Sequence, residues 1–226
     1  MTQEGHACGE MSAGTFFQTV GGQYSQALGM HEIALVCVLA LEGHDSPDVA
    51  NSYLGIGNVY YSQGQYERAL EYYQKCLDIR IRVFGSDHLD VAASYNNIGE
   101  VYRQQGKYEE ALEYYQKDLD ITVRLVGQDH PDVAKSYGNL GLVYDRQGQY
   151  ERALEYYQKA LEIFIKVSGQ DHPDVATSYQ NLASVYHSQG NHVQTKEMAT
   201  KAYHIFLKKL GPDHPQTQGL KPFVDE

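Results

Sequence analysis

The sequence predicts an all-α protein built as a solenoid of antiparallel helix pairs. One segment recurs almost unchanged at a spacing of 42 residues, as YERALEYYQKCL at 66–77, YEEALEYYQKDL at 108–119 and YERALEYYQKAL at 150–161. A short linker recurs at the same spacing, as SDHLDVA from Ser86 and as QDHPDVA from Gln128. Self-similarity at a fixed period of this size indicates supersecondary units that stack one on the next.

Each unit contains two helical patterns, which the unit 130–171 shows clearly. Its motif YxxLGxxY, which starts at Tyr137, has the i, i+3, i+4, i+7 spacing of one helix face. Gly148 interrupts this pattern and indicates a turn. A second stripe of the same kind covers 150–161, and Gly169 is placed to end that helix. Most of the 20 tyrosines recur at such positions, so we predict that they form the core of the solenoid.

The linkers predict how each unit begins. Pro173 suits the first turn of a helix because its missing N–H would have no partner there, and Asp174 complements the positive end of the helix dipole. Histidines recur in the linkers one repeat apart, which is too far for them to share a metal ion. We therefore interpret as turn or capping residues His88, His130, His172 and His214.

The period divides the chain into full and partial units. Atypical units are expected at the ends, because a solenoid must stop exposing its stacking face. The expected divisions are 1–21 as an N-terminal segment or degenerate cap, 22–45 as a partial repeat with only the second helix, 46–87, 88–129 and 130–171 as full repeats, 172–213 as a repeat with a decayed second helix, and 214–226 as a C-terminal cap or tail.

Composition and charge argue against several classes of partner. The chain has 18 lysines and arginines against 29 acidic residues, a net charge of −11, whereas general nucleic-acid or anionic-membrane binders need a basic surface. The first basic residue is Arg68, so we expect no secretory signal. The longest apolar run, Ile33 to Leu41, has nine residues and is too short to span a bilayer. We expect a cytoplasmic protein with no nucleic-acid or membrane partner.

No motif predicts an enzyme, a metal site or a cofactor. The three cysteines are widely spaced and form no zinc-binding pair. No GxGxxG follows a strand pattern, no GxxxxGK precedes serine or threonine, and no spacing assembles a Ser/His/Asp or Cys/His set. We therefore expect no catalytic residues, no metal and no cofactor. A metal or catalytic site at His187, His192 and His204 of the last unit is a weaker alternative.

The repeat resembles that of a known family. YxxLGxxY from Tyr137, followed by GxYxxAxxxYxxA from Gly148, is similar to the tetratricopeptide repeat signature, with tyrosine in place of its first tryptophan and later phenylalanine. The 42-residue period and the DHPDVA linker resemble the repeats of kinesin light chain, over roughly residues 22–215. The resemblance implies a right-handed superhelix whose first helices line a concave groove. It also implies a non-enzymatic scaffold or adaptor that binds an extended peptide of a partner protein, as a cargo adaptor does.

The resemblance places a candidate ladder of asparagines in that groove. One position beside the Leu-Gly pair of the first helix carries Asn97, Asn139 and Asn181. An asparagine side chain offers both a donor and an acceptor, which an extended peptide backbone needs. The alternative is that these residues are hydrated asparagines on an exposed helix face. We favour the ladder because a mediocre helix former recurs three times.

Neighbouring groove positions are expected to supply specificity. The basic residues among them stand beside Glu100 and Asp145, so the groove is expected to be only weakly basic, unlike the basic groove of cargo-binding kinesin light chains. By the same resemblance the further candidates are Asn58, Tyr61, Asn96, Arg103, Lys135, Arg146 and Gln180.

A second class of function is suggested by the N-terminal helix. Residues 34–42, ALVCVLALE, align with CLDIRIRVF at 76–84, and two polar positions there become Val36 and Val38. A large exposed apolar patch usually marks an interface, so these valines are candidates for self-association of a structural module through its end faces. The alternative is burial of this helix under residues 12–20. We expect a monomer or a weak homodimer.

Overall fold

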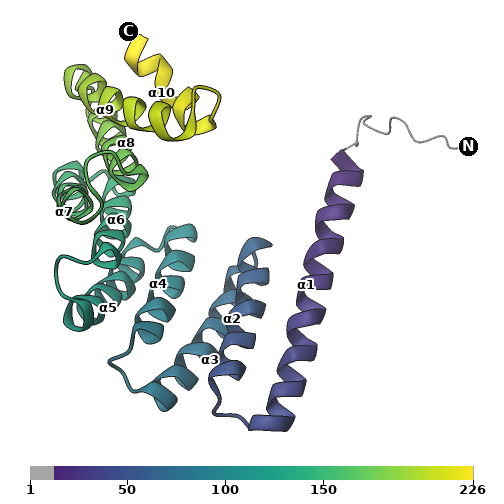
Figure 1. Cartoon of the computed structure of the whole chain (residues 1–226). Coiled ribbons are helices and arrows are strands. Elements are labelled where there is room, and N and C mark those ends of the chain that lie inside the picture. The colour runs from purple at the N-terminus through teal and green to yellow at the C-terminus, as the bar shows by residue number, and fades with distance from the viewer. Residues whose placement is uncertain (1–12, 226) are drawn as a thin grey trace, which may run out of the picture. The chain divides into compact units, whose positions relative to one another are not determined.

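The computed structural model describes residues 13–225, with side chains from 22 to 224 (Figure 1). Every element in this part of the chain is an α-helix, which confirms the all-α prediction. The chain divides into two compact units, Met1–Val83 and Phe84–Glu226. The helices are α1 (Ala13–Glu42), α2 (Pro47–Ser62), α3 (Tyr66–Phe84), α4 (Leu89–Gln104), α5 (Tyr108–Val126), α6 (Pro131–Arg146), α7 (Tyr150–Ser168), α8 (Pro173–Ser188), α9 (His192–Leu210) and α10 (Pro215–Asp225).

Helix pairs make up the unit Phe84–Glu226. Within it α4 packs on α5, α6 on α7 and α8 on α9, and successive pairs meet through α5 with α6 and α7 with α8. Figure 1 shows these helices following one another in chain order from α4 to α10. In the unit Met1–Val83, α1 packs on α2. The pairing is the one that a 42-residue period of two helices predicts.

A side chain caps the start of each first helix. His88, His130 and His172 have extended backbone, and the Nδ1 atom of each accepts a hydrogen bond from the backbone N–H two residues later, at 3.1 to 3.2 Å. Ser46 caps α2 through its Oγ, and His214 Nδ1 accepts such a bond at 3.3 Å before α10. These contacts confirm the interpretation of the linker histidines as caps. An imidazole can accept through Nδ1 only while that nitrogen carries no proton.

Replacing His130 with alanine is expected to lower the stability of the protein by about 1 kcal/mol, because the N–H of Asp132 loses its partner. His130→Ser should keep most of that stability, since Ser46 fills the same position in the first full repeat. Thermal unfolding of the full chain measures both variants. An equal loss in the two variants would contradict a capping role for His130.

A small residue in each first helix lets the second helix approach closely. A Cβ atom added to Gly141 would lie 2.9 Å from ring carbons of Tyr157, closer than Cβ atoms approach in real structures. The glycine therefore allows the close packing of α7 against α6. The equivalent pairs are Gly57 with Tyr73, Gly99 with Tyr115 and, in the last repeat, Ala183 with Ala199.

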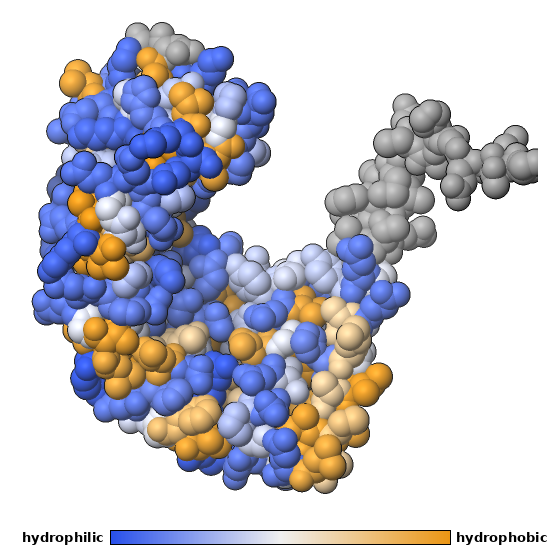
Figure 2. Space-filling view, in the orientation of Figure 1, coloured by the Kyte–Doolittle hydropathy of each residue, from blue (hydrophilic) through white to orange (hydrophobic). Residues whose placement is uncertain are grey.

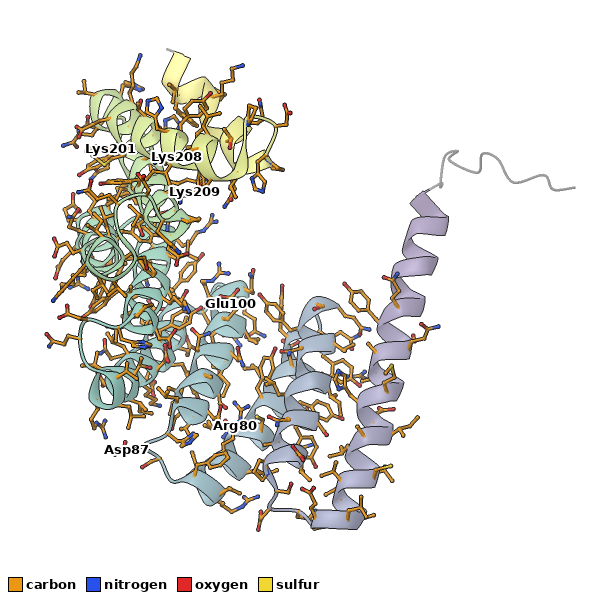
Figure 3. All side chains as sticks on the ribbon, in the orientation of Figure 1. Arg80, Asp87, Glu100, Lys201, Lys208 and Lys209 are labelled. Carbon is orange, nitrogen blue, oxygen red and sulfur yellow. The ribbon has the colours of Figure 1, made fainter. Side chains whose placement is uncertain are left out.

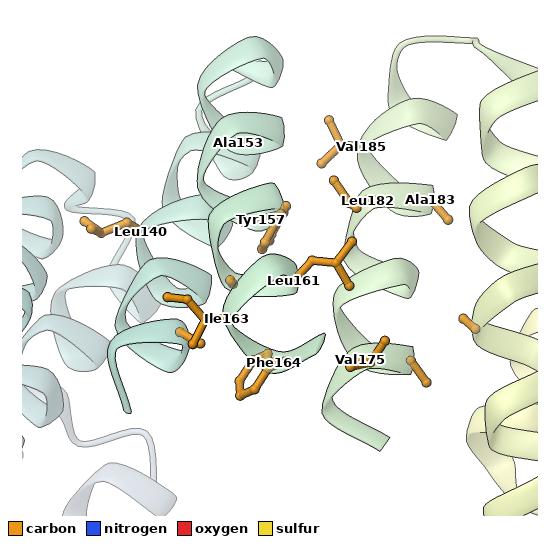
Figure 4. Packing of buried hydrophobic residues seen from close by; sticks show 14 of the residues in the cluster. Leu140, Ala153, Tyr157, Leu161, Ile163, Phe164, Val175, Leu182, Ala183 and Val185 are labelled. Atoms are coloured by element: carbon orange, nitrogen blue, oxygen red, sulfur yellow. The ribbon is translucent and has the colours of Figure 1, made fainter. Parts of the chain in front are cut away.

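The core of the unit Phe84–Glu226 forms where the inward faces of these helices meet. Leu140 and Val143 of α6 and Leu161 of α7 belong to one buried cluster. Figure 4 shows Leu161 reaching from α7 toward α8, where Val175 and Leu182 lie. Burial of one such leucine or valine side chain contributes about 1.5 to 3 kcal/mol, so the stacking of repeats rests mainly on these apolar contacts.

The N-terminal end differs from the expected division. Helix α1 runs without a break from Ala13 to Glu42, so the expected boundary between residues 21 and 22 falls inside one helix. Residues 13–20 continue this helix, and a continuous α-helix cannot fold back on itself. The described part of that segment therefore does not cover residues 34–42.

One face of α1 is apolar and exposed, and Figure 2 shows orange residues along this helix. The two valines singled out from the sequence differ in their surroundings. Val36 is 67% exposed. Val38 is half-buried and packs against the core cluster of Val49, Ala50, Cys76 and Ile79. The other large exposed apolar residues of α1 are Met30, Ile33 and Leu41.

The stretch Gly22–Glu42 of α1 is long and apolar enough to cross a membrane, judged by length and composition alone. The nine-residue run of the sequence understates this, because apolar character continues on both sides of interruptions such as Glu32. A buried helix of a soluble protein and a signal sequence meet the same criterion, so the stretch is weak evidence for a membrane.

Helix α10 covers the other end of the unit Phe84–Glu226. It packs on α9, and Leu220 is 3% exposed. The ring of Phe223 stands edge-on to the ring of His187, with 5.3 Å between their centroids. Through these contacts α10 buries part of its surface against the last full repeat.

Candidate functional site

A row of cavities follows the first helices of the unit Phe84–Glu226. A cavity of about 560 Å³ lies between α4 and α6, and one of about 260 Å³ lies between α6 and α8. Two more, of about 440 and 190 Å³, lie farther along α6 and α8 and between α8 and α10. Neighbouring cavities share lining residues, namely Lys135 and Asn139, then Asn181, then Gln180. They therefore form one continuous surface, which we call the first-helix groove.

Six of the ten residues predicted for the groove line it in the structure. Asn96, Lys135 and Asn139 line the cavity between α4 and α6. Arg146, Gln180 and Asn181 line the cavities between α6 and α8. Asn97 and Arg103, which are also on α4, lie outside these four cavities. The contribution of each residue to binding stays a prediction.

The three ladder asparagines are not equivalent. Asn139 Nδ2 donates a hydrogen bond of 2.7 Å to Asn96 Oδ1, which joins α6 to α4 across the groove. One repeat later the counterpart of Asn96 is Gly138, and a Cβ atom added there would meet open space. The groove is therefore bridged beside Asn139 and open beside Asn181. The bridge still leaves Asn139 with its own oxygen and one N–H for a ligand.

Arg103 is paired within the fold. Its Nε donates to Glu100 Oε2 at 2.8 Å, and its Nη2 donates to Glu100 Oε1. The hydroxyl of Tyr115 also donates to Glu100 Oε2 at 2.8 Å, and Figure 3 marks Glu100 on α4. The hydrogen bond with Glu100 is the main cause that raises the pKa of Arg103. Glu100 therefore neutralises the charge of Arg103 within the fold.

The two candidates in the unit Met1–Val83 also have partners there. Asn58 is exposed, and its Oδ1 accepts a hydrogen bond of 2.7 Å from the hydroxyl of Tyr73. The ring of Tyr61 is half-buried and lies 5.9 Å, between centroids, from the ring of Tyr66.

The sequence analysis missed Asp118 of α5, which lies in the wall of the cavity between α4 and α6. Its side chain is buried, and it accepts hydrogen bonds from Ser136 Oγ at 2.7 Å and from Thr122 Oγ1 at 3.3 Å. Burial is the main cause that raises its pKa, to about 6. The sequence signal for this residue was a single substitution in the repeated segment: YEEALEYYQKDL has aspartate where the equivalent segments have Cys76 and Ala160.

A second missed residue is Tyr157, whose buried ring lines both cavities between α6 and α8. The equivalent tyrosine hydroxyls donate to Glu100 one repeat earlier and to Asn58 two repeats earlier, but the third repeat has Leu142 at that position. Within the described residues, no hydrogen bond to the Tyr157 hydroxyl is found. Burial raises the pKa of this hydroxyl, so it remains a donor at neutral pH.

The charged pair next to this hydroxyl completes the wall between α6 and α8. Asp145 and Arg146 both line the cavity. Burial raises the pKa of Asp145, and the neighbouring Arg146 partly offsets the shift. The wall thus combines amides, a hydroxyl donor and charges of both signs.

The described residues contain no group of three or more histidine, cysteine or acidic side chains arranged to hold a metal ion. The histidines of the last repeat make other contacts. His187 lies against Phe223, and the ring of His204 lies 5.8 Å from that of Tyr203 between centroids.

Three solved structures illustrate what this fold is similar to. BtubC (BKLC) from P. vanneervenii has a TM-score of 0.75 and 27% identity, covering 88% of this chain and 78% of that chain. A putative kinesin light chain of Podosopora anserina with nearly identical TPR-like repeats has a TM-score of 0.69 and 23% identity, covering 83% and 89%. The apo form of RapI has a TM-score of 0.71 and 21% identity, covering 92% and 77%. No curated protein matches the chain.

The family comparison covers all the repeats. The model of the tetratricopeptide repeat matches residues 19–82, 48–122, 90–166 and 132–208. The structural neighbours are solenoids of the same repeat, which confirms the predicted solenoid and its likeness to kinesin light chain repeats. Proteins built from this repeat are generally non-enzymatic scaffolds for protein–protein interaction. The chain belongs to the tetratricopeptide repeat family.

Proposed function

We propose that this protein is an adaptor that binds an extended peptide segment of a partner protein in the first-helix groove. The continuity of the groove carries the proposal, since each cavity shares a polar side chain with the next. An extended peptide presents a donor and an acceptor at each residue, and amide side chains spaced along a groove can pair with both. A compact ligand would need one enclosed cavity instead.

The role of a cargo-type adaptor in the cytoplasm belongs to this proposal. Its support is the likeness of the repeats to those of the putative kinesin light chain and of BtubC (BKLC). The charges of the groove indicate a different peptide chemistry from an acidic ligand, because Lys135 is bonded to Asp132 and Arg146 stands beside Asp145.

Replacing Asn139 and Asn181 together with alanine is expected to weaken the binding of captured peptides about thirtyfold, since each amide loses hydrogen bonds worth about 1 kcal/mol. The peptides are first selected from a random display library with the full chain. The matched control replaces Gln116 and Gln158, exposed amides one repeat apart on α5 and α7, and should leave binding unchanged. Equal affinity of both double variants for every captured peptide would contradict a role of the asparagine ladder in binding.

Tyr157→Phe is expected to weaken peptide binding by about threefold to tenfold, the worth of one hydrogen bond. It should leave stability unchanged, because the hydroxyl has no partner in the described part of the free protein. Tyr115→Phe is the matched control and should lower stability without lowering affinity, because its hydroxyl is bonded to Glu100. Calorimetric titration and thermal unfolding measure the two effects. The reverse pattern would contradict the assignment of Tyr157 to the ligand.

Self-association is the second candidate function, and the exposed apolar face of α1 favours it. Met30, Ile33, Val36 and Leu41 are each at least two-thirds exposed. Light scattering of the full chain over a range of concentrations tests the idea. The proposal requires a dimer that Val36→Asp dissociates, and a monomer at high concentration would exclude it.

A further inference from the structure

The cavity between α4 and α6 differs from its counterpart one repeat later in size and charge. A shift of 42 residues maps most of its lining onto the cavity between α6 and α8. The first measures about 560 Å³ and the second about 260 Å³. Two substitutions on one face of the second helix set the cavities apart: Asp118 corresponds to Ala160, and Thr122 to Phe164.

The fold itself does not need Asp118. The same position holds Cys76, Ala160 and Ala202 in the other repeats, and all three are buried without a charge. Asp118 is 7% exposed. A buried carboxylate normally requires a cationic partner, because its removal from water is costly.

No cation of the described chain supplies that partner. Asp118 receives only the hydroxyl bonds from Ser136 and Thr122. Of the residues that line the cavity, Lys135 alone is cationic, and its Nζ bonds Asp132 Oδ1 at 2.8 Å. Asp90 and Asp132 add two further carboxylates to the lining. The cavity is therefore a negatively charged space whose deepest charge has no counter-ion.

The first full repeat shows what kind of group fits this place. The counterpart of Thr122 there is Arg80, which is 6% exposed. Its Nη2 donates to Asn51 Oδ1 at 3.2 Å, and Asn51 is the counterpart of Ala93 in the lining of the cavity. A guanidinium thus occupies the corresponding place in one repeat, and the next repeat has a short threonine and a carboxylate there.

We propose that the cavity between α4 and α6 is a subsite for a positively charged side chain, arginine or lysine, of the bound peptide, with Asp118 as its counter-ion. This inference rests on the proposed function and specifies its ligand. A guanidinium or ammonium group would give Asp118 the charge-assisted hydrogen bonds that the fold leaves unmade. Thr122, in place of phenylalanine, provides the room for it.

The test compares two pools of short random peptides with the full chain. One pool has a fixed arginine, and the other has citrulline, its uncharged isostere, at the same position. We expect the arginine pool to bind at least about tenfold more tightly. The preference should disappear in Asp118→Ala and in Thr122→Phe, which copy the residues of the sibling cavity at Ala160 and Phe164. Both variants are expected to fold, because the sibling repeat carries the same residues.

The matched control is Asp120→Ala, which removes an exposed charge from the same helix and should keep the arginine preference. Equal binding of the two pools, or an arginine preference that survives Asp118→Ala, would overturn the subsite while leaving the groove in place. Failure of every pool to bind would overturn both proposals. N-methylguanidinium is a second probe. Competition with the arginine pool and none with the citrulline pool supports a cation site, and equal competition with both pools would overturn it.

Discussion

Replacing Asp118 with alanine is expected to stabilise the folded protein at neutral pH by up to about 3 kcal/mol. Burial raises the pKa of Asp118 from 3.8 to about 6, although the bonds from Ser136 and Thr122 lower it. The folded state therefore holds this proton more tightly than the unfolded chain does. At about 1.4 kcal/mol per pKa unit, the ionised carboxylate costs the fold roughly 3 kcal/mol above that pKa. Alanine avoids the cost, and Ala160 shows that it fits.

The gain from Asp118→Ala should depend on pH in a definite direction. Between about pH 4 and pH 6 the folded protein binds a proton that the unfolded chain has released, so wild-type stability falls as the pH rises through this window. The variant has no carboxylate at this position and so does not lose stability in this way. The difference in stability between the variant and the wild type should therefore be largest near neutral pH and small near about pH 4. Unfolding of both full chains at the two pH values measures it, with Asp120→Ala as the control. A variant less stable than the wild type at neutral pH would contradict the assignment.

Tyr115→Ala is expected to lower the stability of the protein by about 3 to 5 kcal/mol, the range for deleting a buried aromatic ring. The ring is 1% exposed and fills the space beside Gly99, and its hydroxyl bonds Glu100. Removal therefore opens a cavity and loosens the Glu100–Arg103 pair as well. Chemical unfolding of the full chain measures the loss.

A second substitution tests whether the loss comes from the Gly99–Tyr115 contact. Gly99→Ala added to Tyr115→Ala copies the pair Ala183 and Ala199 of the last repeat. The double variant should recover about 1 kcal/mol, because alanine is a better helix former than glycine and the ring no longer excludes its Cβ. Gly99→Ala alone should give no such gain, since the Cβ would lie 2.9 Å from the ring. Equal effects of Gly99→Ala in both backgrounds would contradict this packing.

The repeated part of the fold could be predicted from the sequence, because the period reports helices, turns and core positions together. As expected, the YxxLGxxY motif from Tyr137 lies in α6, and the linker histidine His130 caps the start of that helix. The start of α1 could not be predicted in this way. Residues 13–21 have no counterpart in the other units, and a helix without a repeated or amphipathic pattern gives no period to read.

The positions of the candidate site residues on their helices could be predicted, but the hydrogen bonds and ion pairs of their side chains could not. The period places Asn139 and Arg103 on first helices, but it does not reveal that Asn139 bridges to Asn96 or that Glu100 neutralises Arg103. Such contacts depend on side chains that differ between repeats. Asp118 and Tyr157 were missed because a repeat pattern draws attention to shared residues, whereas these two owe their settings to departures from it.

The central claim is that a peptide lies in the first-helix groove, and site-specific photo-crosslinking tests it most directly. A photoreactive residue replaces Lys135, which lines the groove, or Gln158, which is exposed on α7 outside it. Each full chain is irradiated with peptides selected on the unmodified protein. The account predicts crosslinks from position 135 and none from position 158. Crosslinks from position 158 with none from position 135 would contradict it.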